Sequence, residues 1–189
     1  MGYQKWSYEL LHGFCMDAFE KFGFTEAEAN IIQDVLLTAD LYGIESHGMQ
    51  RMVRYHKCIE KGMIHVDAKP EVVFETPVSA VVDGHDGMGQ LIGHFAMELA
   101  IEKAKKSGVG IVSARNSNHF GIAGYYAKMA VAWAVSVYFA AFPDEMLTYL
   151  QDGHKLDEFT YKKSLQKITE SYRVDKEMKK IIKEMRQRG

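Results

Sequence analysis

The sequence has little cysteine and no long apolar run, and each absence excludes a class of protein. Its two cysteines, Cys15 and Cys58, lie far apart and form no C-x-x-C pair. This usage predicts a reduced, cytoplasmic setting, with a single disulfide left open as the alternative. The longest stretch without a charged residue, Met129 to Pro143, is shorter than the roughly 18 residues that a membrane-spanning helix needs. We therefore expect no membrane association.

Internal repeats, low-complexity segments and Gly/Ser-rich linkers are also missing. A G-x-G pair occurs at Gly87 and Gly89, but Gly93 falls one residue too late for the G-x-G-x-x-G pattern. The sequence therefore gives no support for a Rossmann dinucleotide-binding domain. With 189 residues and 47% hydrophobic composition, the chain is nevertheless large and apolar enough to bury a sizeable core.

Charge is distributed unevenly along the chain, although the net charge is only −2. From Lys155 to Gly189, eleven Lys or Arg residues stand against six Asp or Glu, so this segment is basic at +5 and the rest is acidic. Acidic residues interleave with the basic ones in the segment, which favours a solvated helical surface over a nucleic-acid interface. No nucleic-acid partner is predicted.

Helical spacing of apolar residues recurs four times before residue 110. The predicted helices cover 4–22, 26–42, 46–61 and 90–106. Thr25 and Glu28 fit a capping box at the start of the second helix, where each side chain bonds a free backbone amide. Val53 and Met63 belong to the apolar positions of the third helix and are predicted to pack on the core.

Short runs of β-branched residues predict three strands, at 72–74, 80–82 and 109–112. The last of them is predicted to be buried. Residues 131–142 fit two alternatives, a continued buried helix or a helix end followed by a strand. Further helices are predicted from Pro143 onward, over 156–172 and over 174–188.

These elements predict an α/β fold with a helical N-terminal region, a mixed α/β centre and a helical C-terminal tail. The predicted domain boundaries follow the same division. They place the N-terminal helical region at 1–70, the α/β central region at 71–142 and the tail at 143–189.

His47, Arg51 and Tyr55 stand four residues apart in the third predicted helix, so their side chains line one face of it. That face presents an imidazole, a guanidinium and a phenol in a row. A solvated polar edge explains the same spacing, and the three residues alone leave both interpretations open.

The segment from Asn116 to Tyr126 follows the third predicted strand and is rich in Gly, Asn and Ser. It predicts a turn that opens a helix, in which Gly121 and Gly124 permit close approach of a ligand or of another backbone. His119 would lie at the mouth of this turn, where an imidazole can donate or accept a proton near neutral pH. A histidine that only makes local hydrogen bonds is the other interpretation.

Asp83, His85, Asp86 and His94 are the remaining candidates for a ligand set. They lack the tight spacing of His or Cys ligands that is typical of metal sites. A polar turn before a helix is the preferred interpretation, so no metal is predicted.

Three motifs occur in order along the chain. They are Ala39-Asp40-Leu41-Tyr42-Gly43-Ile44-Glu45-Ser46-His47-Gly48 with Arg51 and Tyr55, then Asp83-Gly84 with Gly87 and Gly89, then Asn116-Ser117-Asn118-His119-Phe120-Gly121 with Gly124-Tyr125-Tyr126. Together they resemble the type-2 malate/L-lactate dehydrogenase family, which also includes ureidoglycolate, sulfolactate and diketogulonate oxidoreductases. The resemblance covers about residues 5 to 130.

The resemblance implies a central region of the type-2 malate/lactate dehydrogenase kind, which is not a Rossmann fold. It also implies an NAD- or NADP-dependent oxidoreductase that transfers a hydride between the nicotinamide and a small 2-oxo acid or 2-hydroxy acid. In such a family, His47 or His119 would be the catalytic acid/base, and Ser46 would support His47. The chemistry is consistent, because hydride addition leaves charge on the carbonyl oxygen and an imidazolium can protonate it.

Substrate and cofactor residues follow from the same resemblance. Arg51 would hold the substrate carboxylate through two parallel hydrogen bonds, and Tyr55, one turn along, would add a phenol contact. Gly121 and Gly124 are expected to lie against the cofactor. Apolar surface left uncovered predicts self-association, so we expect a homo-oligomer, in the simplest case a dimer.

The resemblance fades after about Ala130. Where family members run a strand into a Thr-Asn pair, this chain has Ala140-Ala141-Phe142-Pro143, and residues 143–189 match no family motif. A second hypothesis follows from this departure. The chain would be a truncated, non-catalytic remnant, or a subunit that binds small carboxylates through Arg51 and His119 or needs a partner chain.

Overall fold

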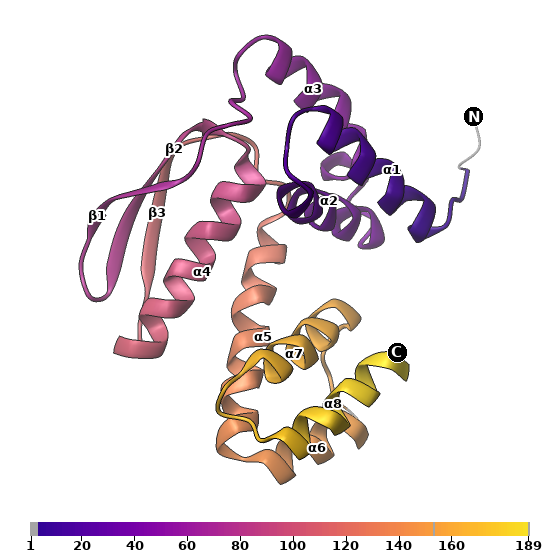
Figure 1. The fold of residues 1–189 in the computed structure, drawn as a ribbon, viewed down its shortest axis with the longest axis vertical. Helices are drawn as coiled ribbons and strands as arrows, with labels where there is room; N and C mark the ends of the chain where they lie inside the picture. The colour runs from indigo at the N-terminus through magenta and orange to yellow at the C-terminus, as the bar shows by residue number, and fades with distance from the viewer. Residues whose placement is uncertain (1–3, 153, 189) are drawn as a thin grey trace. The chain divides into compact units, whose positions relative to one another are not determined.

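The computed structural model describes residues 4–152 and 154–188, and Figure 1 shows its fold. The chain divides into two compact units, Met1–Tyr125 and Tyr126–Gly189. Each unit has an apolar core of its own. The first unit holds the N-terminal helices and the sheet together, and the three-part organisation predicted from the sequence stays a prediction.

The first unit contains helices, two 3-10 turns and a three-stranded sheet. In chain order its elements are α1 (Tyr8–Lys21), α2 (Glu26–Leu41), η1 (Glu45–His47), η2 (Met49–Arg51), α3 (Met52–Glu60), β1 (Glu71–Glu75), β2 (Ser79–Gly87), α4 (Gly89–Ser107), β3 (Ile111–Ser117) and the start of α5 (Ala123–Ala141).

Side-chain caps fix where the first two helices begin. The Ser7 hydroxyl accepts a hydrogen bond from the Leu10 amide at the start of α1. At the start of α2, the Thr25 hydroxyl accepts from the Glu28 amide, and the Glu28 carboxylate accepts from the Thr25 amide. The capping box predicted from the sequence is therefore confirmed.

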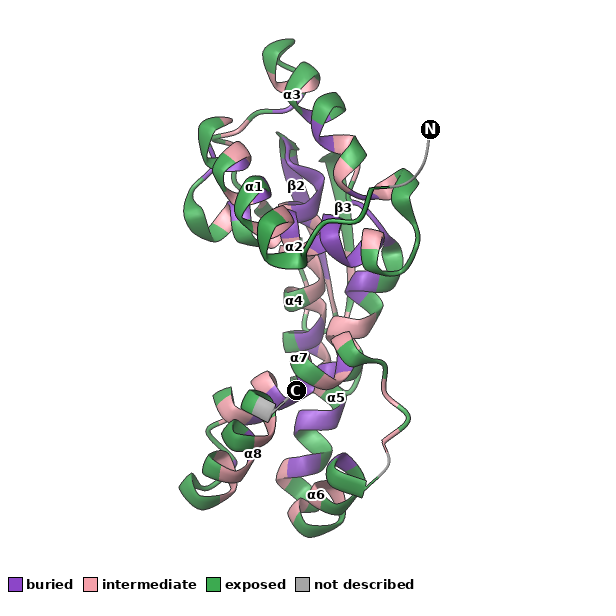
Figure 2. Cartoon of the chain, turned by 90° about the vertical axis from the view of Figure 1, so that its right-hand side faces the viewer, coloured by how far each residue is buried: buried purple, intermediate pink, exposed green. Residues whose placement is uncertain are grey.

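The sheet has the strand order β1-β2-β3. β1 pairs with β2 in antiparallel fashion, and β2 pairs with β3 in parallel fashion through a crossover that contains α4. α4 packs against β2 and β3 (Figure 1). The central strand β2 is the most buried of the three, as the purple ribbon in Figure 2 shows. This arrangement is the mixed α/β centre that the sequence predicts.

The third strand differs from its prediction in length and burial. A buried strand was expected over 109–112, whereas β3 runs from Ile111 to Ser117 and is mostly exposed, with Ile111 at 62%. The physical reason is its position, because β3 pairs only with β2 in the sheet. The strand therefore reaches further toward His119 than the apolar run alone indicates.

The helix predicted over 46–61 is wrong in its first part. Two 3-10 turns, η1 and η2, precede α3, which begins only at Met52. Gly48, between the two turns, has an extended backbone with φ −89° and ψ −151°. This break interrupts the helical phase on which the prediction of the helix faces depended.

The faces of α3 are consequently rotated from their predicted positions. Val53 and Met63, predicted to pack on the core, are exposed by 64% and 57%. Tyr55, predicted on the polar face, is only 1% exposed. The core of the first unit instead combines apolar residues from α1, α2 and α3 with a few that follow them. Its buried members are Cys15, Phe19, Phe24, Ala29, Ile32, Leu36, Leu37, Met52, Tyr55, Ile64 and Met88.

Both cysteines are free thiols, so the disulfide left open by the sequence does not form. Cys15 is buried in the core beside Met52, with 3.7 Å between the two sulfur atoms. Cys58 is half-buried.

The second unit is helical. It contains the rest of α5, then α6 (Pro143–Asp152), α7 (Glu158–Glu170) and α8 (Lys176–Arg188). Residues 131–142, for which the sequence allowed a helix or a strand, belong to α5 up to Ala141. The core of this unit is Val135, Phe139, Leu150, Leu165, Ile168, Val174 and Ile182.

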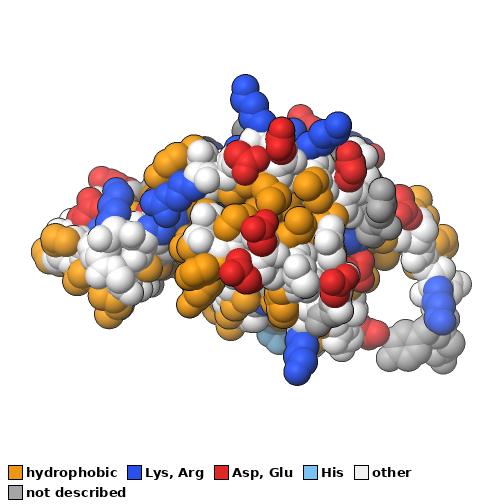
Figure 3. Space-filling view, turned by 90° about the horizontal axis from the view of Figure 1, so that it is seen from below, with side chains coloured by type: hydrophobic (Ala, Val, Ile, Leu, Met, Phe, Trp, Pro, Cys, Tyr) orange, Lys and Arg blue, Asp and Glu red, His pale blue; other side chains and the backbone are white. Residues whose placement is uncertain are grey.

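Charged side chains of both signs share the surface. Seen from below, Lys and Arg side chains stand near Asp and Glu, with apolar side chains between them (Figure 3). In α7, Lys162 and Lys167 pair with Glu158 and Glu170 at 2.9 and 3.0 Å. Among the helices that the structure describes, we find none that is both long and apolar enough to cross a bilayer.

Candidate active site

Asp83 anchors the start of the turn that carries His119, defined here as the His119 turn (residues 116–121). Its carboxylate accepts hydrogen bonds from Asn116 Nδ2 at 2.9 and 3.0 Å and from Arg115 Nε at 2.8 Å. The bonds from Asn116, the His85 amide and Arg115 lower the pKa of Asp83 to about 2. They also hold Asn116 at φ 48°, a left-handed conformation that asparagine tolerates better than most residues. Asp83, considered above as a metal ligand, therefore has a structural role.

Asn118 and Gly89 fix the other side of the His119 turn. Asn118 Nδ2 donates to the backbone carbonyls of Asp86 at 2.8 Å, Gly87 at 3.0 Å and Met63 at 3.2 Å. Gly89, the first residue of α4, lies so close that a Cβ atom there would be 2.3 Å from the Asn118 carbonyl oxygen. The G-x-G pair in the sequence thus permits the turn to pack directly on the start of α4.

His119 contacts residues from two other elements. Its Nδ1 atom lies 2.7 Å from the Tyr55 hydroxyl, and Gln90 Nε2 donates to the same hydroxyl at 2.9 Å. Because Gln90 supplies a hydrogen to the phenol oxygen, the phenol proton is directed to Nδ1, which also accepts from the Gly121 amide at 3.4 Å. The second ring nitrogen, Nε2, is left for a ligand. The His47 ring lies beside the His119 ring, with 5.3 Å between the two ring centroids.

Ser46, His47 and Arg51 come from the two 3-10 turns. The Ser46 hydroxyl lies 2.9 Å from His47 Nδ1. Arg51 Nε donates to the Ser46 carbonyl, which fixes the guanidinium and leaves its two terminal nitrogens for another acceptor. The local backbone therefore holds an imidazole and a cation next to His119.

Asp40, near the end of α2, holds this segment in place. Its carboxylate accepts a hydrogen bond from the Met49 amide at 2.8 Å. A Cβ atom at Gly48 would lie 1.8 Å from the Asp40 carboxylate, so the contact needs a glycine. The sequence motif from Asp40 to Gly48 thus encodes a carboxylate clamp that positions Ser46 and His47.

Burial and neighbouring positive charge both act on the imidazole of His119. Burial is the larger cause, and the charges of Arg51, His47 and Arg54 add to it, so the pKa of His119 lies below its ordinary value near 6.5. Burial also raises the pKa of Tyr55, which therefore keeps its proton near neutral pH. In the free chain at neutral pH, His119 is an uncharged imidazole.

Removing the charge of Arg51 should raise the pKa of His119. In Arg51→Gln, one of the nearby positive charges that disfavour the imidazolium is lost, so protonation becomes easier. An NMR pH titration of the His119 ring should place its midpoint below 6.5 in the wild type and higher in the variant. The control is Lys106→Gln, which removes an exposed cation from the end of α4. An equal rise in the control would show that the effect is one of net charge.

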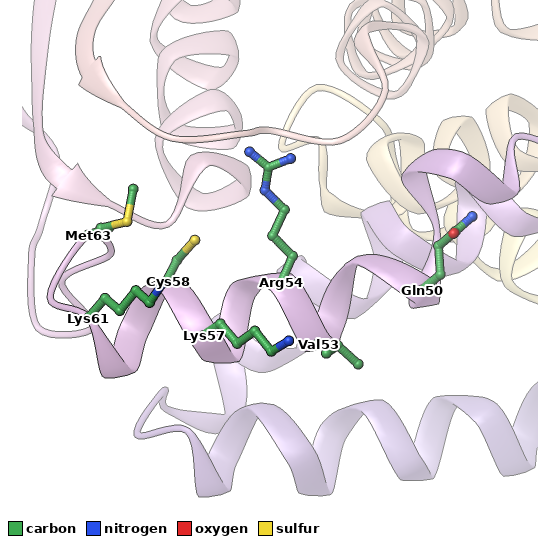
Figure 4. Close-up of a pocket in the computed structure, with 7 residues that line it drawn as sticks. All are labelled: Gln50, Val53, Arg54, Lys57, Cys58, Lys61 and Met63. Carbon is green, nitrogen blue, oxygen red and sulfur yellow. The ribbon is translucent and has the colours of Figure 1, made fainter.

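Figure 4 shows a pocket formed by α3 and the segments on either side of it, defined here as the basic hollow. Its volume is about 390 Å³, within the range of small-molecule sites. The lining residues are Gln50, Val53, Arg54, Lys57, Cys58, Lys61 and Met63. Among the residues that the structure describes, no carboxylate forms an ion pair with Arg54, Lys57 or Lys61. Their positive charges are therefore available to an anion.

Five of the residues singled out in the sequence come together. Ser46, His47, Arg51, Tyr55 and His119 are joined by the contacts given above, although they lie in segments more than 60 positions apart in the chain. Tyr55 departs from its expected place, because its hydroxyl lies behind the His119 ring and bonds Nδ1. That position supports orientation of the imidazole.

The two glycines expected at the cofactor have different surroundings. Gly121 has φ +83°, and a Cβ atom there would lie 2.4 Å from Val35 Cγ1, so packing against α2 already requires a glycine. Gly124, in the first turn of α5, is exposed and has open space where a Cβ would lie. Of the two, Gly124 presents free backbone at a helix start.

Sequence reasoning did not identify Gln90 or the anchoring role of Asp83. Gln90 is fully buried at the start of α4, where a polar side chain needs a partner. A glutamine directly after a G-x-G pair, inside an otherwise apolar segment, was the available signal. Its partner could not be inferred, since Tyr55 lies 35 residues earlier.

Comparison with known proteins identifies the family. The family model described as malate/L-lactate dehydrogenase matches residues 6–140. This chain belongs to the malate/L-lactate dehydrogenase family. The match contains all three sequence motifs and continues about ten residues past Ala130, where the motif resemblance fades.

Several relatives of the chain are dehydrogenases. The chain is 51% identical to malate dehydrogenase of Pyrococcus abyssi over 120 residues, which is 64% of this chain and 33% of the relative. It is 48% identical to L-sulfolactate dehydrogenase of Methanocaldococcus jannaschii over 116 residues, 61% of this chain and 34% of the relative.

Solved structures of the family share the fold. The structure of malate dehydrogenase from Pyrococcus horikoshii OT3 matches with a TM-score of 0.67 and 46% identity, over 69% of this chain and 39% of that one. This likeness confirms the predicted fold class of the malate/lactate dehydrogenase kind. The chain spans about a third of the length of the curated relatives that it matches.

Proposed function

We propose that this chain takes part in an oxidoreductase reaction that transfers a hydride between NADH or NADPH and a small 2-oxo acid or 2-hydroxy acid. The observation that carries the proposal is the convergence of two imidazoles and a guanidinium at the His119 turn. His119 Nε2 and the terminal nitrogens of Arg51 are left by their other contacts to meet a ligand. The relatives named above are dehydrogenases of malate and sulfolactate, which are 2-hydroxy acids.

The nicotinamide, when bound, supplies the hydride that adds to the carbonyl carbon. Arg51 would bind the carboxylate beside that carbonyl with two parallel hydrogen bonds and so orient it. His119 Nε2 would face the carbonyl oxygen and supply the proton that the oxygen needs after hydride addition. Tyr55 and Gln90 would hold the ring in this orientation, since they bond the opposite nitrogen.

The lowered pKa of His119 affects whether the ring is ready for oxidation of a hydroxy acid or for reduction of a 2-oxo acid. Because Nδ1 accepts from the Tyr55 hydroxyl, the uncharged ring that the free chain holds at neutral pH carries its proton on Nε2, which therefore cannot accept the proton of a hydroxy acid. A bound substrate carboxylate adds negative charge beside the ring and raises its pKa again. Substrate binding would therefore prepare His119 for the reductive direction.

The residues near the turn also fit a nicotinamide dinucleotide. Gly124 offers an exposed helix start, where backbone amides bind phosphate groups. We infer that Gly124 lies against the cofactor and that Gly121 shapes the turn. Self-association is proposed with this function, because apolar side chains on β1 and β3, such as Phe74 at 58% and Ile111 at 62%, are exposed.

The proposal is tested by titrating the purified chain with NADH and NADPH, with and without oxaloacetate, and following nicotinamide fluorescence. We expect saturable binding, followed by oxidation of the cofactor when the 2-oxo acid is added. Arg51→Lys should raise the KM for oxaloacetate by about tenfold or more, because an ammonium group cannot make the two parallel bonds. Cofactor binding should not change in this variant.

Two results would count against the proposal. Unchanged kinetics in Arg51→Lys would remove Arg51 from the site. Carboxylate binding without any cofactor binding, in a chain shown to be folded by circular dichroism, would favour the second hypothesis, a carboxylate-binding subunit that depends on another chain.

A further inference from the structure

Arg54 occupies a position that the proposed reaction has not yet used. It follows Arg51 by three residues, and Arg51 is the N-cap residue of α3 with helical φ −72° and ψ −18°, so the two residues lie one turn apart at the start of that helix. Figure 4 shows the Arg54 guanidinium extended away from the helix, while Lys57 lies along it. Arg54 is exposed and lines the basic hollow.

One residue that lines the hollow is hydrogen-bonded to the His119 turn. Met63 lines the hollow, and its backbone carbonyl accepts a hydrogen bond from Asn118, the residue before His119. The charge of Arg54 also acts on both His119 and Tyr55, in each case favouring the less protonated form. Arg54 is therefore electrostatically part of the same site, although it makes no contact with the proposed reacting groups.

Two arginines one helical turn apart can bind two anionic groups of one ligand. One carboxylate on Arg51 satisfies only the first of them. A cation that lies beside a partly buried site without an acidic partner favours a ligand that brings a second negative charge. Lys57 and Lys61, further along the hollow, add to the positive potential there.

We propose that Arg54 is a specificity-determining residue that binds the second acidic group of a dianionic 2-oxo or 2-hydroxy acid. This inference rests on the proposed function, because it takes the first carboxylate to lie on Arg51. It assigns the hollow at Arg54 to the far end of the substrate. A second carboxylate or a sulfonate meets the requirement, whereas a methyl group does not.

The test compares two ligands that differ at the far end. L-Malate has a carboxylate where L-lactate has a methyl group, and both share the hydroxy acid end. By isothermal titration calorimetry, the wild-type chain should bind malate at least about tenfold more tightly than lactate, as a charge-assisted hydrogen bond allows. Arg54→Gln should reduce malate affinity to near that of lactate and leave lactate affinity within about threefold, well below one charge-assisted bond.

Matched variants separate charge from position. Arg54→Lys keeps the charge and should retain part of the preference for malate. Lys106→Gln removes a cation of the same unit at the end of α4 and should leave both affinities unchanged. Arg54 is exposed, so its substitution should not unfold the chain, and thermal unfolding followed by circular dichroism checks this.

The outcomes distinguish this inference from the function on which it rests. If malate and lactate bind the wild type equally, or if Arg54→Gln weakens both by the same factor, Arg54 does not select the second acidic group. The proposed function would survive either result. If neither ligand binds a folded wild-type chain, the carboxylate site at Arg51 fails and the inference fails with it. Inorganic phosphate binding that depends on Arg54, with malate binding unaffected, would assign the hollow to phosphate and overturn the inference.

Discussion

His119→Asn should lower the rate of NADH oxidation by oxaloacetate by about 10²- to 10⁴-fold, the usual contribution of a general acid or base. Asparagine can still form hydrogen bonds at this position, but it cannot exchange a proton near neutral pH. The substrate carboxylate would still bind Arg51, so KM should change far less than kcat. Steady-state kinetics with oxaloacetate as the varied substrate measures both quantities.

Two further histidine variants serve as the comparison and the control for His119→Asn. His47→Asn tests the other imidazole, whose ring centroid lies 5.3 Å from that of His119. We expect a smaller loss there, since Ser46 bonds Nδ1 of His47 but no buried phenol fixes its ring. His56→Asn, on an exposed part of α3 beside Glu60, is the control and should keep full activity. Full activity in both His47→Asn and His119→Asn would end the acid/base proposal.

Gly89→Ala should destabilise the first unit by roughly 3 kcal/mol, the upper part of the range for overpacking substitutions. The added Cβ would lie 2.3 Å from the Asn118 carbonyl oxygen and 2.4 Å from that of His119. Both contacts are to backbone, which cannot rotate away as a flexible side chain does. The His119 turn must therefore move from α4, and NADH oxidation should fall together with the free energy of unfolding measured in urea.

Gly124→Ala is the matched control for stability. Gly124 also lies in the first turn of a helix, but a Cβ atom there meets nothing within 4 Å. Alanine is the better helix former, so this variant should be neutral or more stable by up to about 1 kcal/mol. Equal stability losses in both variants would show that the close approach of the His119 turn is not the reason why residue 89 must be a glycine.

The fold class and the main elements follow from local sequence patterns. The capping box at Thr25 and Glu28 locates the start of α2, because a cap acts between residues only three apart. The change from helical to β-branched spacing near residue 71 locates the sheet. Patterns of this kind succeed where the residues that determine an element are its own near neighbours.

The faces of α3 could not be predicted in the same way. Their phase depends on the break at Gly48, and that break depends on the Asp40 carboxylate, which bonds the Met49 amide from another helix. The apolar spacing assigns Val53 to the core, and the spacing of His47, Arg51 and Tyr55, carried across the break, places Tyr55 on a neighbouring polar face. Both assignments are reversed in the structure.

The sequence by itself determined the chemistry that the chain carries: the histidines, arginine and serine of its motifs, and the family to which those motifs point. Only the tertiary structure decided how these groups meet. It placed Tyr55 and Gln90 behind His119, turned Asp83 into the anchor of the His119 turn, and set Arg54 beside a hollow near that turn. The physical reason is that these hydrogen bonds join residues 33 to 64 positions apart, and no local pattern of spacing records such contacts.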